Sequence, residues 1–169
     1  MDKKYEILND DYIIFNGHKL FRIRALKDFA LNIFLPIHKG DLGGYIQSEE
    51  NLSQDGNCWV ADNAIVMENA RVKNNAWVFG NAWVGNNARV FDDAWVADNA
   101  RIRDNAYVSG NAYVGDNACV SANAKVYDDA CVYGYAKVYG DACVYGYAKV
   151  CRYAVVCDNA KVYKLTRVN

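Results

Sequence analysis

The chain lacks a strong charge of either sign. Its 169 residues include 19 lysines and arginines and 20 aspartates and glutamates, which leaves a net charge of −1. A nearly neutral protein has little long-range attraction for nucleic acids or anionic membranes. We therefore expect neither of these as a partner, and any binding has to come from a local arrangement of residues.

The chain also lacks a long apolar run and a leader sequence. Its first residues, Met1-Asp2-Lys3-Lys4-Tyr5, do not follow the basic, apolar, small order of a signal peptide. No segment approaches the roughly 20 apolar residues that a membrane-spanning helix needs. These absences predict a soluble, cytoplasmic protein.

Residues with metal-binding or catalytic chemistry are few and scattered. There are two histidines, His18 and His38, and the six cysteines do not fall at the short spacings of zinc sites. Phosphate-binding loops, nucleophile elbows and nine-residue calcium repeats are missing as well. We expect no bound metal and no cofactor, and isolated thiols are typical of a reducing cytoplasm.

What the chain does have is a six-residue period. Every sixth residue from Val60 to Val168 is aliphatic, eighteen valines and Ile102, and alanine lies two residues earlier at seventeen successive points from Ala64 to Ala160. On an α-helix, valines at this spacing would point in different directions, so a helix is excluded. A fixed period instead indicates a solenoid, whose repeats bury apolar surface by stacking on one another.

Each repeat predicts one short strand and one corner. The alanine and the valine lie two residues apart and share the inner face of a strand, while the residue between them points outward. The next three residues are rich in Asn, Asp and Gly, which tolerate a left-handed backbone. Turn formers of this kind are expected at Asn63, Asn81, Asn99 and Asn117, and solvated corner carboxylates at Asp62, Asp98 and Asp116.

The repeat resembles the hexapeptide repeat of left-handed parallel β-helices, over about three quarters of the chain. The resemblance implies three strands and 18 residues per triangular coil, about seven coils, and a left-handed crossover that ordinary parallel sheets avoid. The expected fold is therefore all-β, a single-stranded left-handed parallel β-helix with an N-terminal β-hairpin cap.

The cap is predicted by the first forty residues, which do not keep the period. Two strand-like segments, residues 11–15 and 19–26, flank Asn16-Gly17, a strong hairpin-turn signal. Residues 28–39 contain the only proline, Pro36, and are expected to form a connector.

Two structural units follow from this division. We expect the cap and connector over residues 1–41 and the β-helix over residues 42–169. Leu42 lies eighteen residues before Val60, so the β-helix is expected to begin there. The first coil is expected to be irregular, with Ile46 and Leu52 on the alanine track.

The other end of the β-helix has no candidate cap. An uncovered end of a β-solenoid exposes unpaired backbone groups. We therefore expect another copy of the chain to cover the last coil, in a homo-oligomer that is a trimer or a dimer.

The opening segment sharpens the family resemblance. Gly40-Asp41-Leu42-Gly43-Gly44-Tyr45-Ile46, with residues 51–60 after it, is similar to the start of a bacterial and prophage subgroup of hexapeptide-repeat proteins. The wider superfamily includes trimeric acyltransferases with a histidine base and an acyl-CoA site between coils. The resemblance thus implies an acyltransferase with His38 as base, but neither histidine occupies a coil position, and fold alone does not carry activity.

Sorting the outward residues by eighteen gives three faces. The aromatic face carries Trp59, Trp77, Trp95, Tyr113, Cys131, Lys149 and Arg167. The mixed face carries Ile65, Trp83, Arg101, Cys119, Lys137 and Val155. The basic face carries Arg71, Arg89, Tyr107, Lys125, Cys143 and Lys161. Because Cys119, Cys131 and Cys143 fall on different faces, they cannot pair with one another.

The faces supply the candidate binding residues. Trp59, Trp77, Trp95 and Tyr113, with Phe79 beside them and Trp83 on the next face, form either a contact surface or an aromatic row that only stabilises the sheet. Arg71, Arg89 and Lys125 are either contacts for an anion or a solvated face.

Two functions remain open. The first, which we favour, is a non-catalytic binding or scaffold protein that uses these faces for self-association and for a partner, such as a host protein or a nucleotide-like ligand. The second is the acyltransferase that uses acyl-CoA and His38.

Overall fold

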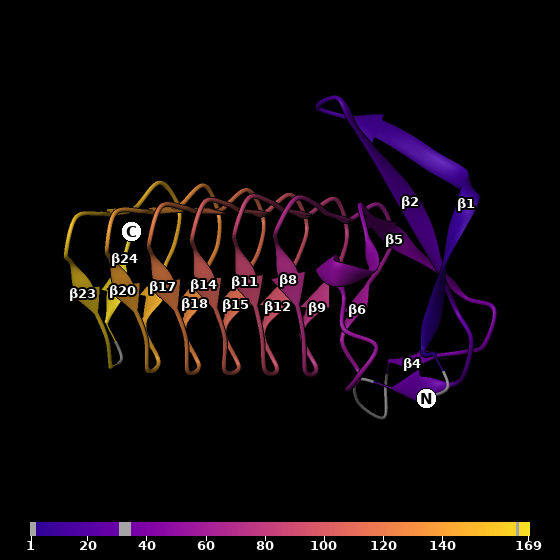
Figure 1. Cartoon of the computed structure of the whole chain (residues 1–169). Helices are drawn as coiled ribbons and strands as arrows, with labels where there is room; N and C mark the ends of the chain where they lie inside the picture. The colour runs from indigo at the N-terminus through magenta and orange to yellow at the C-terminus, as the bar shows by residue number, and fades with distance from the viewer. Residues whose placement is uncertain (1–2, 31–34, 165) are drawn as a thin grey trace.

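The protein is an all-β parallel solenoid of about seven turns with an antiparallel hairpin at its N-terminal end (Figure 1). The computed structural model describes residues 3–30, 35–164 and 166–169. Residues 31–34 of the predicted connector, and Leu165 in the last coil, lie outside the described residues. The predicted fold class is confirmed.

Three sheets form the sides of the solenoid, and their strands pair in register with strands one coil away. The aromatic face is built on β6 (Trp59–Val60), β9 (Trp77–Val78), β12 (Trp95–Val96), β15 (Tyr113–Val114), β18 (Cys131–Val132), β21 (Lys149–Val150) and β24 (Arg167–Val168). The basic face is built on β8 (Arg71–Val72), β11 (Arg89–Val90), β14 (Tyr107–Val108), β17 (Lys125–Val126), β20 (Cys143–Val144) and β23 (Lys161–Val162).

The third sheet joins the solenoid to the cap. Its order is β1 (Tyr5–Phe15), β2 (His18–Ala25), β5 (Leu42–Ile46), β7 (Ile65–Val66), β10 (Trp83–Val84), β13 (Arg101–Ile102), β16 (Cys119–Val120), β19 (Lys137–Val138) and β22 (Val155–Val156). Two short strands of the connector, β3 (Phe29–Ala30) and β4 (Pro36–Ile37), pair antiparallel with each other. They were not predicted, because the connector does not keep the six-residue period that indicated the two-residue strands of the solenoid.

The interior is a column of alanine and valine. Every alanine and aliphatic residue of the period from Ala64 to Val150 is completely shielded from solvent. Backbone hydrogen bonds join the coils: Trp95 donates to the carbonyl of Ala112 and Ala97 to that of Val114, both at 2.9 Å. A valine that is fully buried contributes about 1.5–3 kcal/mol, so the period itself accounts for the stability of the coils.

The corners correct one expectation. The left-handed residue is the one before each predicted asparagine, as in Asp62 (φ 56°) and Asp98 (φ 58°). The asparagine instead hydrogen-bonds along the solenoid, since Asn63 Nδ2 donates to Asn81 Oδ1 at 3.5 Å. Asn87 likewise donates to Asn105 at 3.1 Å. The corner asparagines therefore connect successive coils by side-chain hydrogen bonds, and they do not occupy the left-handed positions.

The first coil has 20 residues, which corrects the predicted register. Ile46 pairs with Val66 and Leu52 with Val72, so both lie on the valine track and not on the alanine track. Leu42 is 55% exposed and pairs with Arg24 of the hairpin, so it is not a core residue eighteen before Val60.

The two additional residues enlarge the corner at residues 53–57. The side chain of Gln54 there accepts the backbone N–H of Lys4 at 2.8 Å and donates to the carbonyl of Tyr5 at 3.2 Å. Lys4 is fully buried, and its Nζ donates to the carbonyls of Gly56 (3.2 Å) and Cys58 (2.9 Å). The irregular corner thus binds the start of β1 through these hydrogen bonds.

The only helix in the described part of the chain is the short 3-10 turn η1 (Glu49–Asn51). No helix among those residues is long and apolar enough to cross a membrane.

Candidate functional site

The predicted faces are present in the structure. On the aromatic face, Trp77 lies between Trp59 and Trp95 of the neighbouring strands. On the basic face, Arg89 lies between Arg71 and Tyr107 in the same way. The outward residues of each face therefore align along the solenoid as their spacing predicts. How much of each face is open to a ligand depends on the contacts that these residues make within the chain.

The aromatic face is largely covered by its own contacts. Trp59 is 1% exposed because Tyr5 and Phe29 of the cap pack edge-on against it, with ring centres 6.3 and 5.4 Å away. This corrects the expectation that Trp59 is exposed: the hairpin and connector fold over the first coil. Trp59 belongs to the core between cap and solenoid.

Trp77 and Trp95 form a compact cluster with Phe79. Trp77 is 7% exposed, and Phe79 lies edge-on to both indoles, at 5.9 Å from Trp77 and 5.8 Å from Trp95. Arrangements of this kind stabilise a sheet by about 0.5–1.5 kcal/mol per pair beyond burial. The cluster brings the predicted residues together, but its surface is mostly used inside the chain.

Tyr113, at the end of the aromatic row, folds back over Gly115. A Cβ at position 115 would lie 2.0 Å from the Tyr113 hydroxyl, so only glycine leaves room for the ring. The hydroxyl donates to Asp98 at 3.2 Å. Partial burial, followed by the charge of Asp98, raises the pKa of Tyr113 to about 12. This tyrosine is thereby held against its own corner.

Trp83, on the mixed face, packs against the hairpin. Its ring centre is 6.0 Å from that of Phe15 near the tip of β1. Its indole N–H is buried and has no hydrogen-bond partner within the described part of the chain. Trp83 is therefore the residue of the mixed face against which the tip of the hairpin packs.

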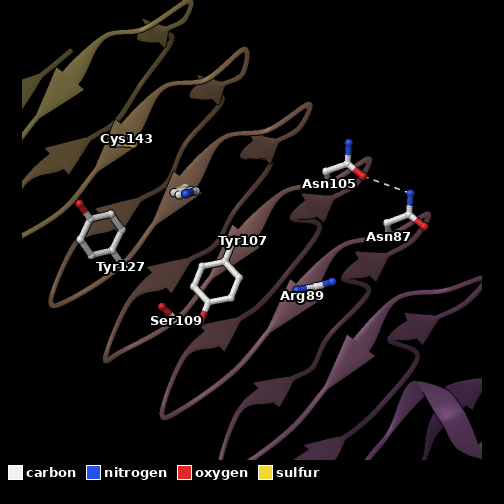
Figure 2. A pocket seen from close by; sticks show the side chains of 8 residues that line it. Asn87, Arg89, Asn105, Tyr107, Ser109, Tyr127 and Cys143 are labelled. Carbon is white, nitrogen blue, oxygen red and sulfur yellow. Dashed lines mark hydrogen bonds between the residues drawn. The ribbon is translucent and has the colours of Figure 1, made fainter.

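The basic face has an open hollow with a volume of about 680 Å³ (Figure 2). Its lining consists of Asn87, Arg89, Asn105, Tyr107, Ser109, Lys125, Tyr127 and Cys143. None of these residues is acidic. The hollow thus combines two cations, two phenol rings and several neutral hydrogen-bonding groups.

Tyr107 forms the floor of this hollow. It comes from β14, between β11 with Arg89 and β17 with Lys125. In Figure 2 its ring is seen face-on, so the flat side of the phenol is turned out of the sheet. Phe91 supports the ring edge-on, with the ring centres 5.8 Å apart and an interplanar angle of 83°.

The cations of the basic face differ in their surroundings. Arg71 donates from Nη2 to Glu50 at 2.8 Å, so part of its charge is already compensated. Arg89 and Lys125 are in no ion pair among the described residues. Of the three predicted anion contacts, the structure therefore places two in the hollow and one outside it.

His38 lies in a tight turn next to the cap. Its backbone N–H donates to the Asp41 carboxylate at 2.7 Å, and its carbonyl accepts the N–H of Asp41 at 3.0 Å. The hollow of the basic face has no histidine in its lining. The structure thus gives His38 a place in the connector turn and none in the hollow.

The cysteines are all free thiols. Cys58 is buried, and burial raises its pKa although the Lys4 amine lies 3.3 Å from its sulfur. Among the described residues, no three His, Cys, Asp or Glu side chains are grouped so that they could hold a metal ion.

The C-terminal half exposes further aromatic surface. Tyr127, Tyr145 and Tyr163 stack in a file with ring centres 5.0 and 5.4 Å apart, and Tyr135 stacks on Tyr153 at 5.2 Å. Tyr153 is 77% exposed. Tyr135 is 54% exposed as well, whereas Tyr127 and Tyr145 of the file are half-buried.

Sequence reasoning missed how Tyr107, Ser109 and Tyr127 complete the hollow. The sequence does place Tyr107 between Arg89 and Lys125 on the basic face, and that alternation of cation and ring was the available signal. No protein family matches the chain, and no curated protein matches it.

Proposed function

We propose that this protein is a non-catalytic binding protein whose basic face holds a nucleotide-like anion. The observation that carries the proposal is the hollow in which Tyr107 lies flat between Arg89 and Lys125, without an acidic residue in the lining. Such a ligand has two parts that these residues can bind: the base can stack on the phenol ring, and the phosphates can contact the two cations.

Stacking on Tyr107 accounts for the base. Stacking of a nucleobase on an aromatic side chain is worth about 1–3 kcal/mol, and it accepts any base because every base has a flat π-face. The amides of Asn87 and Asn105 lie on one side of the hollow and the Ser109 hydroxyl also lines it. These groups supply hydrogen bonds that fix the orientation of the ring.

The two cations account for the phosphates. Neighbouring strands of a sheet are about 4.8 Å apart, so Arg89 and Lys125, two coils apart, start about 10 Å from each other. Their long side chains can close on a phosphate chain from both sides, and arginine offers it paired donors. The solenoid holds all of these residues on packed strands, which keeps the entropic cost of binding low.

The segment that opens the β-helix, residues 40–46, supports a biological role for ligand binding. Residues 40–46 resemble the start of hexapeptide-repeat proteins of bacteria and prophages, so we propose a host-interaction role in which the protein binds a host nucleotide or a host protein. The acyltransferase that uses acyl-CoA and His38 stays a prediction, and we favour the binding protein because His38 does not line the hollow.

Self-association remains part of the proposal. Its support is the exposed aromatic surface of the C-terminal half, where Tyr147 and Tyr153 are 62% and 77% exposed. Light scattering of the wild-type protein is expected to give a dimer or a trimer, and Tyr147→Ser with Tyr153→Ser to give a smaller species. A monomeric wild type would remove this part of the proposal and leave the ligand site intact.

Titration calorimetry with ADP tests the ligand site. Wild-type protein is expected to bind ADP more tightly than adenosine or inorganic diphosphate, since each of these lacks one half of the contacts. Arg89→Gln and Lys125→Gln are expected to weaken ADP binding by roughly tenfold or more, because each removes a charge-assisted hydrogen bond.

Lys149→Gln is the matched control, because Lys149 is an exposed strand residue of the aromatic face. It should leave the affinity unchanged. Equal affinities of wild type and Arg89→Gln for ADP, or no binding of ADP at all, would contradict a nucleotide site on the basic face.

A further inference from the structure

The mixed face contains a second hollow, separate from the one on the basic face. Its volume is about 400 Å³, and its cationic lining residues are Arg101, Arg103 and Lys137. Asn99 and Asn117 precede the strands of this face, so they lie on the side of the hollow opposite to Arg103, which follows its strand. Cys119 lies between Arg101 and Lys137 along the sheet. No acidic residue lines it.

The charges of the three cations are not used in ion pairs within the described part of the chain. The nearby carboxylates are engaged along the corners: Asp104 accepts the backbone N–H of Ala122 at 3.0 Å, and Asp116 that of Gly134 at 2.9 Å. The hollow therefore concentrates positive charge with hydrogen-bond donors that are free to turn towards a ligand.

Trp83 supplies the one aromatic side chain in the lining. Its indole lies across Gly85, where a Cβ would approach Nε1 to 2.9 Å. Gly85 occupies the corner position one coil before Arg103, so the indole lies on the same side of the face as that guanidinium. The indole N–H is closed off from solvent, so the donors that a ligand in the hollow can reach are the cations and the amides of the lining.

The spacing selects the kind of anion. Arg101 and Lys137 are two coils apart, hence about 10 Å between their backbones, and Arg103 is two residues from Arg101, about 7 Å along the strand. A single small monoanion cannot engage all three cations from the centre. An anion with two or more linked charged groups can, and the short side chain of Cys119 between them leaves it room.

We infer that this hollow is a second anion site, which takes a compact polyvalent anion of the diphosphate class. Its one aromatic lining residue, Trp83, lies over Gly85 and packs edge-on against Phe15 of the hairpin. The three cations of the lining favour recognition of the charged groups. The site does not depend on the nucleotide site, since the two hollows share no lining residue.

Protection of Cys119 from iodoacetamide tests the inference. The probe is sodium diphosphate, with sodium chloride at the same ionic strength as reference, and peptide mass spectrometry measures the modification of each cysteine. At about ten times the dissociation constant, diphosphate should slow modification of Cys119 by about tenfold, because only the free protein reacts.

Cys131 is the internal control, because it is a half-buried cysteine at the same strand position on the aromatic face. Its rate should not change. The Arg101→Gln, Arg103→Gln double variant, checked for an unchanged melting temperature, should lose the protection of Cys119. Lys137→Gln should reduce it.

Three outcomes overturn the inference. These are unchanged reactivity of Cys119 at all diphosphate concentrations, equal slowing at Cys119 and Cys131, and protection of Cys119 that persists in the double variant. Cys143, in the hollow of the basic face, reports on the nucleotide site in the same digest. Failure at one site is therefore distinguishable from failure at the other.

Discussion

The carboxylate of Asp116 accepts a 2.9 Å hydrogen bond from the backbone N–H of Gly134, which occupies the same corner one coil further along. Asp116 in turn donates its own N–H to Asp98 at 3.1 Å. The side chain of the left-handed residue in one coil thus accepts a hydrogen bond from the backbone N–H of the left-handed residue in the next coil. The corners are fastened to one another by side chains as well as by the strands between them.

Asp116 is expected to stabilise the solenoid through both its conformation and its carboxylate. Asp116→Gly keeps a residue suited to positive φ and loses only the hydrogen bond, about 1 kcal/mol. Asp116→Ala loses the same hydrogen bond but keeps a Cβ in the left-handed region without the polar side chain that lets Asp adopt it, which makes it about 1–2 kcal/mol less stable than the Gly variant. Chemical denaturation should rank Asp116→Asn as the mildest and Asp116→Ala as the most severe. Equal stability of all three would show that the corner contact contributes nothing.

Lys4 is expected to hold the cap to the first coil. Burial lowers the pKa of its amine, yet the amine donates to carbonyls of the corner at residues 53–57 and of Cys58. Lys4→Met leaves these carbonyls without their donor and should destabilise the protein by about 1–3 kcal/mol. Hydrogen exchange of residues 53–60 and the melting temperature measure the effect.

Lys3→Met is the matched control for this prediction. Lys3 makes a surface ion pair with Glu49 at 2.6 Å, and exposed pairs contribute about 0–1 kcal/mol. If the two variants lose the same stability, the buried amine of Lys4 has no special part in docking the cap.

Val150→Asp is expected to unfold the coils around it. Val150 is completely buried among alanines and valines, and an unpaired carboxylate in such a place costs far more than the few kcal/mol available locally. Lys149→Asp, the neighbouring outward residue, should leave the melting temperature nearly unchanged. Similar melting curves for both variants would contradict the assignment of inward and outward positions.

Tyr113 is expected to make stability depend on alkaline pH. Its pKa is raised to about 12 in the folded protein from 10.0 in the unfolded chain, so the folded state holds the phenol proton more tightly. This contribution is complete below pH 10 and is lost as the pH rises towards 12. Tyr113→Phe should therefore lose less stability over this interval than wild type does. An identical pH dependence would mean that Tyr113 ionises alike in both states.

The six-residue period allowed the solenoid and its three faces to be predicted. Val60 to Val168 define the inner column, and sorting by eighteen placed Trp77 beside Trp95 and Arg89 beside Tyr107. Local spacing was enough here because each coil contacts only its neighbours. The left-handed residue was predicted one position too late, since Asn and Asp are common at both corner positions and composition alone does not separate them.

Contacts between distant segments could not be predicted in the same way. The corner at residues 53–57 has its shape because Lys4 and Tyr5 bind there from about fifty residues away. Trp59 is buried for the same reason, by Tyr5 and Phe29. The hollow on the basic face depends on how Tyr107 lies and on the pairing of Arg71 with Glu50, and neither follows from the period.

Alkylation of Cys143 in the presence of ADP is the most direct test of binding at the basic face, because this thiol lines the hollow. With ADP at about ten times its dissociation constant, iodoacetamide should modify Cys143 about tenfold more slowly, while Cys131 on the aromatic face reacts at its usual rate. At the same ADP concentration, Tyr107→Ala and Arg89→Gln should reduce this protection to about twofold or less. Reactivity of Cys143 that is the same with and without ADP in the wild-type protein would contradict a nucleotide site in the hollow.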